Sequence, residues 1–151
     1  MLIREARSTD CTALIELMQQ LGYQISSDEI AANLHLYEKM QGFVFVVAED
    51  EKAVAMISGV FVPLFHRHEM LFRITTLVVH EEKRGNGLGK ALLQRIEELC
   101  RKKDCDYLEV TSGAHRKKDA HLFYETQGYT MYKGRRFTKR LSQQKKDQGN
   151  T

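Results

Sequence analysis

The sequence predicts a single α/β domain, in which a mixed, mostly antiparallel sheet of about seven strands is flanked by four helices. The apolar residues change their period along the chain, from helical spacing at the start to runs of Val, Ile and Phe in the middle, and back to helical spacing after residue 88. A strand, helix and strand over residues 69–112 require a parallel crossover, whereas the strands before them follow each other as hairpins. The expected order of elements is β-α-α-β-β-β-α-β-α-β-β.

Two helices are expected after a short first strand at residues 2–7. Ser8, Thr9 and Asp10 offer N-caps to the first helix, which ends at Gly22. The spacing of Ser26 and Glu29 is that of a capping box, which starts the second helix. The side chains expected to face inward from these helices are Leu14, Leu17, Met18, Leu21, Ile30, Leu34, Tyr37 and Met40.

The middle of the chain is expected to form strands. Residues 43–49 and 53–62 are rich in Val, Ile and Phe, and the polar residues 49–52 are typical of a hairpin turn between them. A third strand is expected at about residues 69–79, after a polar loop at residues 66–68.

The last part of the chain alternates between helices and strands. An apolar stripe predicts a helix through Leu88, Leu92, Ile96 and Leu99. The elements expected after it are a strand at residues 107–111, a helix at residues 116–127 closed by Gly128, and a strand pair at residues 129–141. The domain is therefore expected to span residues 1–141. Residues 142–151 have almost nothing to bury, which predicts a disordered polar tail.

The composition indicates one globular domain without a membrane span. The chain has 151 residues, of which 42% are hydrophobic and 28% charged. Its longest strongly apolar run, residues 43–48, is far shorter than the roughly 20 residues that cross a bilayer. Cys11, Cys100 and Cys105 cannot all pair, which favours free thiols and a cytoplasmic location. The histidines show no metal-ligand spacing, so no metal is expected.

The charge distribution raises nucleic acid as an alternative partner. The net charge of +3 is small, but seven Lys or Arg and no acidic residue lie within residues 133–146. Binding through this stretch would depend steeply on salt. No aromatic-rich platform or recognition helix supports it, so a solvated face is expected here and nucleic acid is not expected as a partner.

The most informative segment is residues 84–90, which connect a predicted strand to a predicted helix. It consists of Arg84, Gly85, Asn86, Gly87, Leu88, Gly89 and Lys90. Its three glycines remove Cβ atoms where a ligand would approach the backbone. The first turn of the helix offers unpaired N–H groups and the positive end of the helix dipole, which favour an anion such as phosphate. Arg84 and Lys90 add positive charge.

Two common phosphate motifs do not fit this segment. A dinucleotide G-x-G-x-x-G that began at Gly85 would need glycine in place of Lys90. A Walker A motif that ended at Lys90 would need glycine in place of Arg84 and a hydroxyl in place of Ala91. Neither NAD nor ATP is therefore expected.

The segment instead resembles the [QR]-x-x-G-x-[GA] signature of the GNAT N-acetyltransferases, at Arg84, Gly87 and Gly89. About 35 residues later, His121 is followed by residues 122–129 (LFYETQGY), which resemble the F-Y-E-x-x-G-[FY] element of the same superfamily. The resemblance extends over about residues 2–141. It implies a GNAT-like fold and acetyl-CoA as the acetyl donor.

The resemblance also implies roles for individual residues in binding coenzyme A. The amides of residues 85–90 would hold the pyrophosphate, and the strand edge at Leu77, Val78 and Val79 would bind the pantetheine arm. Many relatives have an asparagine for this arm where this chain has Lys117. The chain is similar instead to a subgroup with a Ser-x-x-x-Arg pattern and a later Ala-His-x-Phe-Tyr, in which Ser112 and His121 would line the cofactor site.

The resemblance makes Tyr124 the expected general acid. A phenol with a pKa of about 10 can protonate a thiolate with a pKa of about 8.5 through an existing hydrogen bond. The alternative interpretation of Tyr124 is a core aromatic near the end of its helix. No base is assigned, because family members often carry a carboxylate where this chain has Thr75 and Thr76. Water could relay the proton, or one of three loop residues could accept it: His66, His68 or Glu69.

The leading hypothesis is therefore an enzyme that acetylates a primary amine of a small molecule. The acceptor is expected between the first two helices and the loop at residues 66–69. Acetylation of a peptide or protein amine, and a non-catalytic acetyl-CoA-binding module, are the alternatives. A homodimer paired through the edge at residues 129–141 is a further hypothesis.

Overall fold

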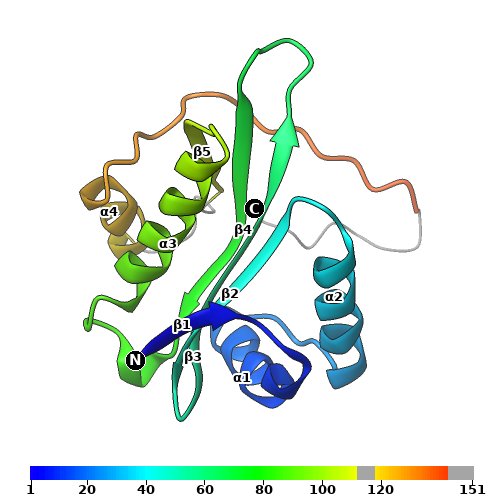
Figure 1. The fold of residues 1–151 in the computed structure, drawn as a ribbon, viewed down its shortest axis with the longest axis vertical. Coiled ribbons are helices and arrows are strands. Elements are labelled where there is room, and N and C mark those ends of the chain that lie inside the picture. Colours follow the sequence, from blue (N-terminus) through cyan, green and yellow to red (C-terminus); the bar gives the residue numbers. More distant parts are fainter. Residues whose placement is uncertain (112–117, 143–151) are drawn as a thin grey trace. The chain divides into compact units, whose positions relative to one another are not determined.

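The computed structural model describes residues 1–111 and 118–142, as two units that are each considered by themselves (Figure 1). The first unit is Met1–Val110 and the second is Thr111–Thr151. Residues 112–117 and 143–151 lie outside the described residues. The predictions for Ser112 and for all but one residue of the polar tail fall on them.

The first unit contains the elements that were expected between residues 2 and 111. They are β1 (Leu2–Glu5), a 3-10 turn (Ser8–Asp10), α1 (Cys11–Leu21), α2 (Ser27–Lys39), β2 (Phe43–Asp50), β3 (Lys52–Pro63), β4 (Met70–Val79), a 3-10 turn (Glu81–Lys83), α3 (Leu88–Lys102) and β5 (Tyr107–Val110). The strands form one sheet in the order β1-β2-β3-β4-β5. Only β4 and β5 pair in parallel, with α3 as the crossover between them, so the prediction of a mixed, mostly antiparallel sheet is confirmed.

The second unit contains α4 (Lys118–Thr126), and residues 127–142 after it form neither helix nor strand. The predicted strand pair at residues 129–141 is therefore wrong, and the described residues form five strands rather than seven. The side chains of Met131, Tyr132 and Phe137 are exposed. A local preference for β structure forms a strand only where a neighbouring strand completes its hydrogen bonds, and none of the five described strands pairs with this segment.

The helix ends follow the local signals in most places. Glu29 donates its N–H to Ser26 Oγ and accepts the Ser26 N–H on its carboxylate, both at 3.1 Å, so the capping box is confirmed. α1 ends at Gly22, whose φ of +103° is a left-handed conformation that favours glycine. The prediction that Met40 faces inward is wrong. Its backbone is extended after the last turn of α2, and its side chain is exposed.

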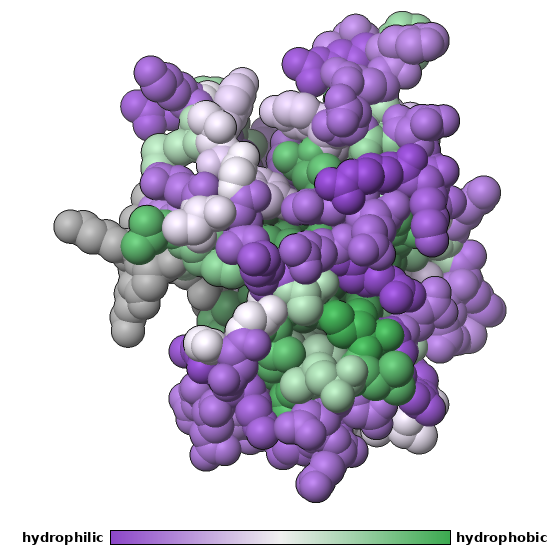
Figure 2. Space-filling model, turned by 60° about the vertical axis from the view of Figure 1, so that its left-hand side comes forward, coloured by the Kyte–Doolittle hydropathy of each residue, from purple (hydrophilic) through white to green (hydrophobic). Residues whose placement is uncertain are grey.

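α1 and α2 cover one face of the sheet and α3 covers the other (Figure 1). The core on the first face joins both helices to three strands, through Leu14, Leu17, Ile30, Leu34, Val47, Ala53, Met56 and Val78. α3 buries the stripe that its spacing predicted, with Leu92 and Ile96 fully buried. Hydrophilic residues dominate the face drawn in Figure 2, with smaller hydrophobic areas exposed among them.

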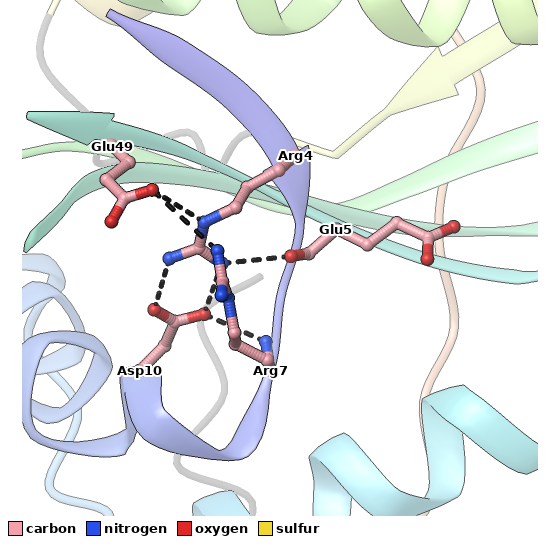
Figure 3. Close-up of polar contacts among 5 residues, drawn as sticks. All are labelled: Arg4, Glu5, Arg7, Asp10 and Glu49. Atoms are coloured by element: carbon pink, nitrogen blue, oxygen red, sulfur yellow. Dashed lines mark hydrogen bonds and ion pairs between the residues drawn. The ribbon is translucent and has the colours of Figure 1, made fainter.

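A cluster of charged side chains joins β1 to the first turn and to β2 (Figure 3). Arg4 donates from Nη1 and Nη2 to the carboxylate of Asp10, at 2.9 and 2.7 Å, and from Nε to Glu49 at 2.8 Å. Asp10 also accepts the N–H of Arg7 at 2.8 Å. Asp10 therefore caps the 3-10 turn, whereas the sequence predicted it as an N-cap of the helix that follows.

Candidate active site

The outer edge of β4 is only half covered by β5. The parallel pairing runs from Leu71 opposite Tyr107 to Ile74 opposite Val110, where β5 ends. Within the described part of the first unit, residues 76–79 therefore pair with β3 alone, and Thr75 is opposite no residue of either strand. The second half of β4 consequently has backbone groups on its other side that are available to a ligand.

A hydrogen bond from His80 shows which residues face this open edge. His80 donates its N–H to the carbonyl oxygen of Val54 on β3, at 2.8 Å. In an antiparallel strand, the N–H and C=O of alternate residues point to the same neighbour. The groups of Val78 therefore point to β3, and those of Leu77 and Val79 point to the open edge. Of the three residues predicted to contact the pantetheine arm, two present their backbone groups there.

The loop at residues 84–90 begins close to the end of this edge. Arg84 donates from Nε to the carbonyl oxygen of Val79 at 3.1 Å, and Asn86 donates from Nδ2 to the carbonyl oxygen of Lys83 at 3.1 Å. Gly85 and Gly87 adopt left-handed conformations, with φ of +81° and +79°. A Cβ on either glycine would meet no described atom within 4 Å, so the space above them is open. Backbone conformation, rather than crowding within the chain, requires glycine here.

The helix that follows this loop presents an uncapped N-terminus. α3 begins at Leu88, and Gly87 at its N-cap offers no side chain to the first-turn N–H groups. Such N–H groups, together with the positive end of the helix dipole, favour an anion. The structure thus brings together the predicted residues Arg84, Gly85, Asn86, Gly87, Leu88, Gly89 and Lys90 next to the end of β4.

The turn before this loop is attached to α1 through a buried histidine. His80 Nδ1 accepts the N–H of Glu82 at 3.2 Å, and Nε2 lies 2.9 Å from the carboxylate of Glu16 on α1. Since Nδ1 accepts, Nε2 carries the proton and donates to Glu16. The hydrogen bond from His80, followed by that from Lys52, lowers the pKa of Glu16. Glu81 also donates its N–H to the Gln20 side chain at 2.9 Å, so two contacts hold this turn on α1.

A cluster of hydroxyl groups lies at a β-bulge in β4. Thr76 lies opposite Ser58 and Ile74 opposite Gly59, which leaves Thr75 between them without a partner on β3. Thr75 Oγ1 lies 2.9 Å from Ser58 Oγ and 3.5 Å from the hydroxyl oxygen of Tyr37 on α2. The sequence identified Thr75 as a residue at the position where family members often carry a carboxylate base. It did not identify Ser58 or Tyr37 as site residues. The available signal was that Ser58 is the only polar side chain in β3 after Lys52.

A cavity of about 100 Å³ opens beside this cluster, between α1, α2 and the sheet. Its lining residues are Leu14, Met18, Ile25, Ile30, Asn33, Tyr37, Phe45, Met56, Ser58 and Thr76. The cavity lies against the first two helices, where the acceptor was expected, but the loop at residues 66–69 does not line it. His66, His68 and Glu69 are exposed on that loop, and Glu69 pairs with Arg67 at 3.6 Å.

His121 and Tyr124 lie on α4, in the second unit. They are three residues apart and therefore share one face of the helix. The helix ends in a Schellman motif: Tyr129 donates its N–H to the Tyr124 carbonyl at 3.0 Å, and Gly128 has a φ of +91°. The ring of Tyr124 packs edge-on against Tyr129, with the centroids 5.8 Å apart. The end of α4 thereby holds the backbone and ring of Tyr124.

Among residues 1–111 and 118–142, no three His, Cys, Asp or Glu side chains are grouped so that they could hold a metal ion. No helix in the described ranges has the length and apolar character needed to cross a membrane.

Comparisons with known proteins agree with this geometry. Residues 10–129 match the acetyltransferase (GNAT) family. The chain is 29% identical to an aminoalkylphosphonate N-acetyltransferase of Salmonella typhimurium over 147 residues, which cover 92% of this chain and 90% of that protein. The structure of an acetyltransferase from Trypanosoma brucei matches with a TM-score of 0.76 and 26% identity, and covers 93% of this chain and 99% of that one.

The fold alone is shared with a glucosamine-6-phosphate N-acetyltransferase from Arabidopsis thaliana, at a TM-score of 0.79 and 23% identity over 93% of this chain and 98% of that one. The family match covers most of the chain and includes both the glycine-rich loop and the segment around Tyr124. The chain therefore belongs to the GNAT family and is an acetyl-CoA-dependent N-acetyltransferase.

Proposed function

We propose that this enzyme transfers the acetyl group of acetyl-CoA directly to a primary amine of a small molecule, with Tyr124 as the general acid. The observation that carries the proposal is the continuity of the anion site at residues 84–90 with the open edge of β4, which Arg84 joins at Val79. A coenzyme with a pyrophosphate and an amide-containing arm fits a helix N-terminus followed by a free strand edge.

The loop and the strand edge would each bind one part of the coenzyme. The N–H groups of residues 85–90 would hold the pyrophosphate, and the charges of Arg84 and Lys90 would add to the attraction. The backbone groups of Leu77 and the N–H of Val79, whose carbonyl oxygen accepts from Arg84, would hydrogen-bond the pantetheine arm, and Val78 would support them from within the sheet. Bound acetyl-CoA supplies a thioester whose carbonyl carbon an amine can attack.

Tyr124 would donate a proton to the sulfur as the thioester breaks. A free phenol, with a pKa of about 10, is more acidic than water and is protonated at neutral pH, so this type of side chain can supply the proton. His121, on the same face of α4, would line the cofactor site together with Ser112. The alternative, that Tyr124 only packs at the end of its helix, predicts a loss of stability without a specific loss of turnover.

Exchange of Tyr124 for Phe separates these two roles. Tyr124→Phe is expected to lower kcat by about 100-fold and to leave the Kd for acetyl-CoA near the wild-type value. The matched control is Tyr132→Phe, since Tyr132 lies in the same unit and is exposed. A Tyr124→Phe enzyme with wild-type kcat would exclude the general-acid role.

The acceptor amine would meet hydroxyl groups rather than a carboxylate. No Asp or Glu lines the cavity beside Thr75, so its nitrogen would be positioned by Ser58, Thr75 and Tyr37 and would lose its proton to water. Release of free thiol from acetyl-CoA with a panel of primary amines tests the whole proposal. If no amine, including those on peptides, releases thiol while acetyl-CoA still binds, the chain is a binding module instead.

A further inference from the structure

The cavity beside the hydroxyl cluster has an uncharged lining. None of the residues that line it is a Lys, Arg, His, Asp or Glu. Six of them are apolar and come from α1, α2, the loop between them and two strands: Leu14, Met18, Ile25, Ile30, Phe45 and Met56. The polar groups that line it are neutral, namely the amide of Asn33 and the hydroxyls of Tyr37, Ser58 and Thr76. A ligand's charged end would find no counter-charge in this cavity.

The size of the cavity limits the ligand further. Its volume is about 100 Å³. An apolar cavity of about 150 Å³ in another protein accommodates benzene. By that comparison, this cavity suits a branched aliphatic chain of about four or five carbons. A phosphonate or a second ammonium group would lose its hydration here without an ionic partner, which costs several kcal/mol.

The hydroxyl groups would hold the reacting nitrogen near the open edge of β4, which is proposed to bind the coenzyme. Thr75 contacts both Ser58 and Tyr37, and Ser58 and Tyr37 line the cavity. The backbone of Leu77, two residues after Thr75, faces the open edge of β4. An amine whose carbon chain fills the cavity therefore has its nitrogen beside the strand segment that is proposed to hold the pantetheine arm.

We infer that the acceptor is a primary amine with a short, branched, uncharged aliphatic chain, for which 3-methylbutylamine is the probe. The inference rests on the proposed function and deepens it. In the reaction, the amine nitrogen forms a bond to the acetyl carbonyl carbon and the carbon–sulfur bond breaks. The nitrogen loses one proton and the sulfur gains one. The acceptor class differs from the aminoalkylphosphonate after which the Salmonella relative is named.

Thiol release from acetyl-CoA provides the test, with four acceptors at matched concentrations. They are 3-methylbutylamine, 2-aminoethylphosphonate, spermidine and a tetrapeptide with a free N-terminus. The expected kcat/KM for 3-methylbutylamine exceeds each of the others by about tenfold or more. A higher kcat/KM for the phosphonate or spermidine overturns this inference alone, whereas a higher kcat/KM for the peptide also overturns the small-molecule acceptor of the proposed function. No release with any of the four overturns the proposed function together with it.

A substitution in the cavity lining, with a control outside the cavity, tests whether the charge of the lining sets the preference among acceptors. Asn33→Lys places a cation at an exposed lining position and is expected to shift the ratio of kcat/KM toward 2-aminoethylphosphonate by about tenfold. Ala32→Lys adds the same charge at an exposed neighbouring position on α2 that does not line the cavity, and it should leave the ratio unchanged. Equal shifts in both variants would show that general charge, and not the cavity, sets the preference.

A further substitution reduces the volume of the cavity. Ile25→Phe is expected to raise the KM for 3-methylbutylamine by about tenfold, with a much smaller effect on ethylamine, whose chain needs less of the cavity. Ethylamine turnover also verifies that the variant is folded. An equal rise in KM for both amines would overturn the assignment of the cavity as the acceptor site.

Discussion

Arg84 Nε donates a hydrogen bond to the carbonyl oxygen of Val79 at 3.1 Å, which ties the first residue of the glycine-rich loop to the last residue of β4. Arg84 therefore holds the loop against the strand, in addition to carrying the positive charge for which the signature selects it. The two segments proposed to hold the pyrophosphate and the pantetheine arm are set side by side through this contact.

Replacement of Arg84 should affect coenzyme binding more than the loss of one surface charge would. Arg84→Ala is expected to raise the Kd for acetyl-CoA by about tenfold, because both the hydrogen bond from the loop to β4 and a nearby charge are lost. Isothermal titration calorimetry gives this Kd directly. Arg95→Ala removes the same charge from an exposed position on α3 and serves as the control. Equal effects of the two variants would contradict a local role for Arg84.

Gly87 offers a test of the anion site against a matched glycine. Gly87 and Gly22 both have a positive φ at a helix end, and a Cβ on either would meet no described atom within 4 Å. Alanine at either position should therefore cost about 1 kcal/mol of unfolding free energy. Only Gly87→Ala should also weaken acetyl-CoA binding, since its Cβ would stand where the ligand approaches. Thermal denaturation and calorimetry measure the two effects separately, and weaker binding by Gly22→Ala would argue against the site.

The hydroxyl of Thr75 can be removed without changing the shape of its side chain. Thr75→Val is expected to lower kcat/KM for the amine by about tenfold, because the amine loses a hydrogen-bond partner, while the Kd for acetyl-CoA stays constant. Thr75→Ser keeps the hydroxyl and should restore most of the activity. Steady-state kinetics at saturating acetyl-CoA decides this. Low activity in both variants would indicate that Thr75 is needed for packing at the bulge.

Asp10 should make the fold sensitive to acid. Burial alone would raise its pKa, but hydrogen bonds from Arg4 and from the Arg7 N–H outweigh that effect and lower it. The unfolded chain, with an Asp pKa of about 3.9, then binds more protons than the folded chain as the pH falls. The stability that Asp10 contributes is present above about pH 4 and is lost as the pH falls toward its pKa in the folded state.

The variant Asp10→Asn tests this contribution at neutral pH. It leaves Arg4 with less charge compensation and is expected to cost about 3 kcal/mol of unfolding free energy. Urea denaturation at pH 7 and at pH 3 measures both effects. The difference between wild type and variant should be smaller at pH 3, and a constant difference would show that the charge of Asp10 is not the cause.

The sequence predicted those parts of the fold that depend on neighbours in the chain. The capping box at Ser26, the left-handed end of α1 at Gly22 and the apolar stripe of α3 all rest on residues within a few positions of each other. The strand pair at residues 129–141 was predicted on the same local basis and is wrong, because a strand also needs a partner in space. The predicted interior position of Met40 is wrong for a related reason, since α2 ends one residue before it.

By itself, the sequence determined the family and indicated the loop proposed to hold the coenzyme, because the residues of that loop are contiguous and a helix N-terminus locally favours an anion. Only the tertiary structure decided which groups of β4 are free, since that depends on where β5 stops and on the register with β3. It alone brought Tyr37, Ser58 and Thr75 together from three separate elements around an uncharged cavity. A bulge and a packed helix set these contacts through long-range pairing, which no local pattern of residues encodes.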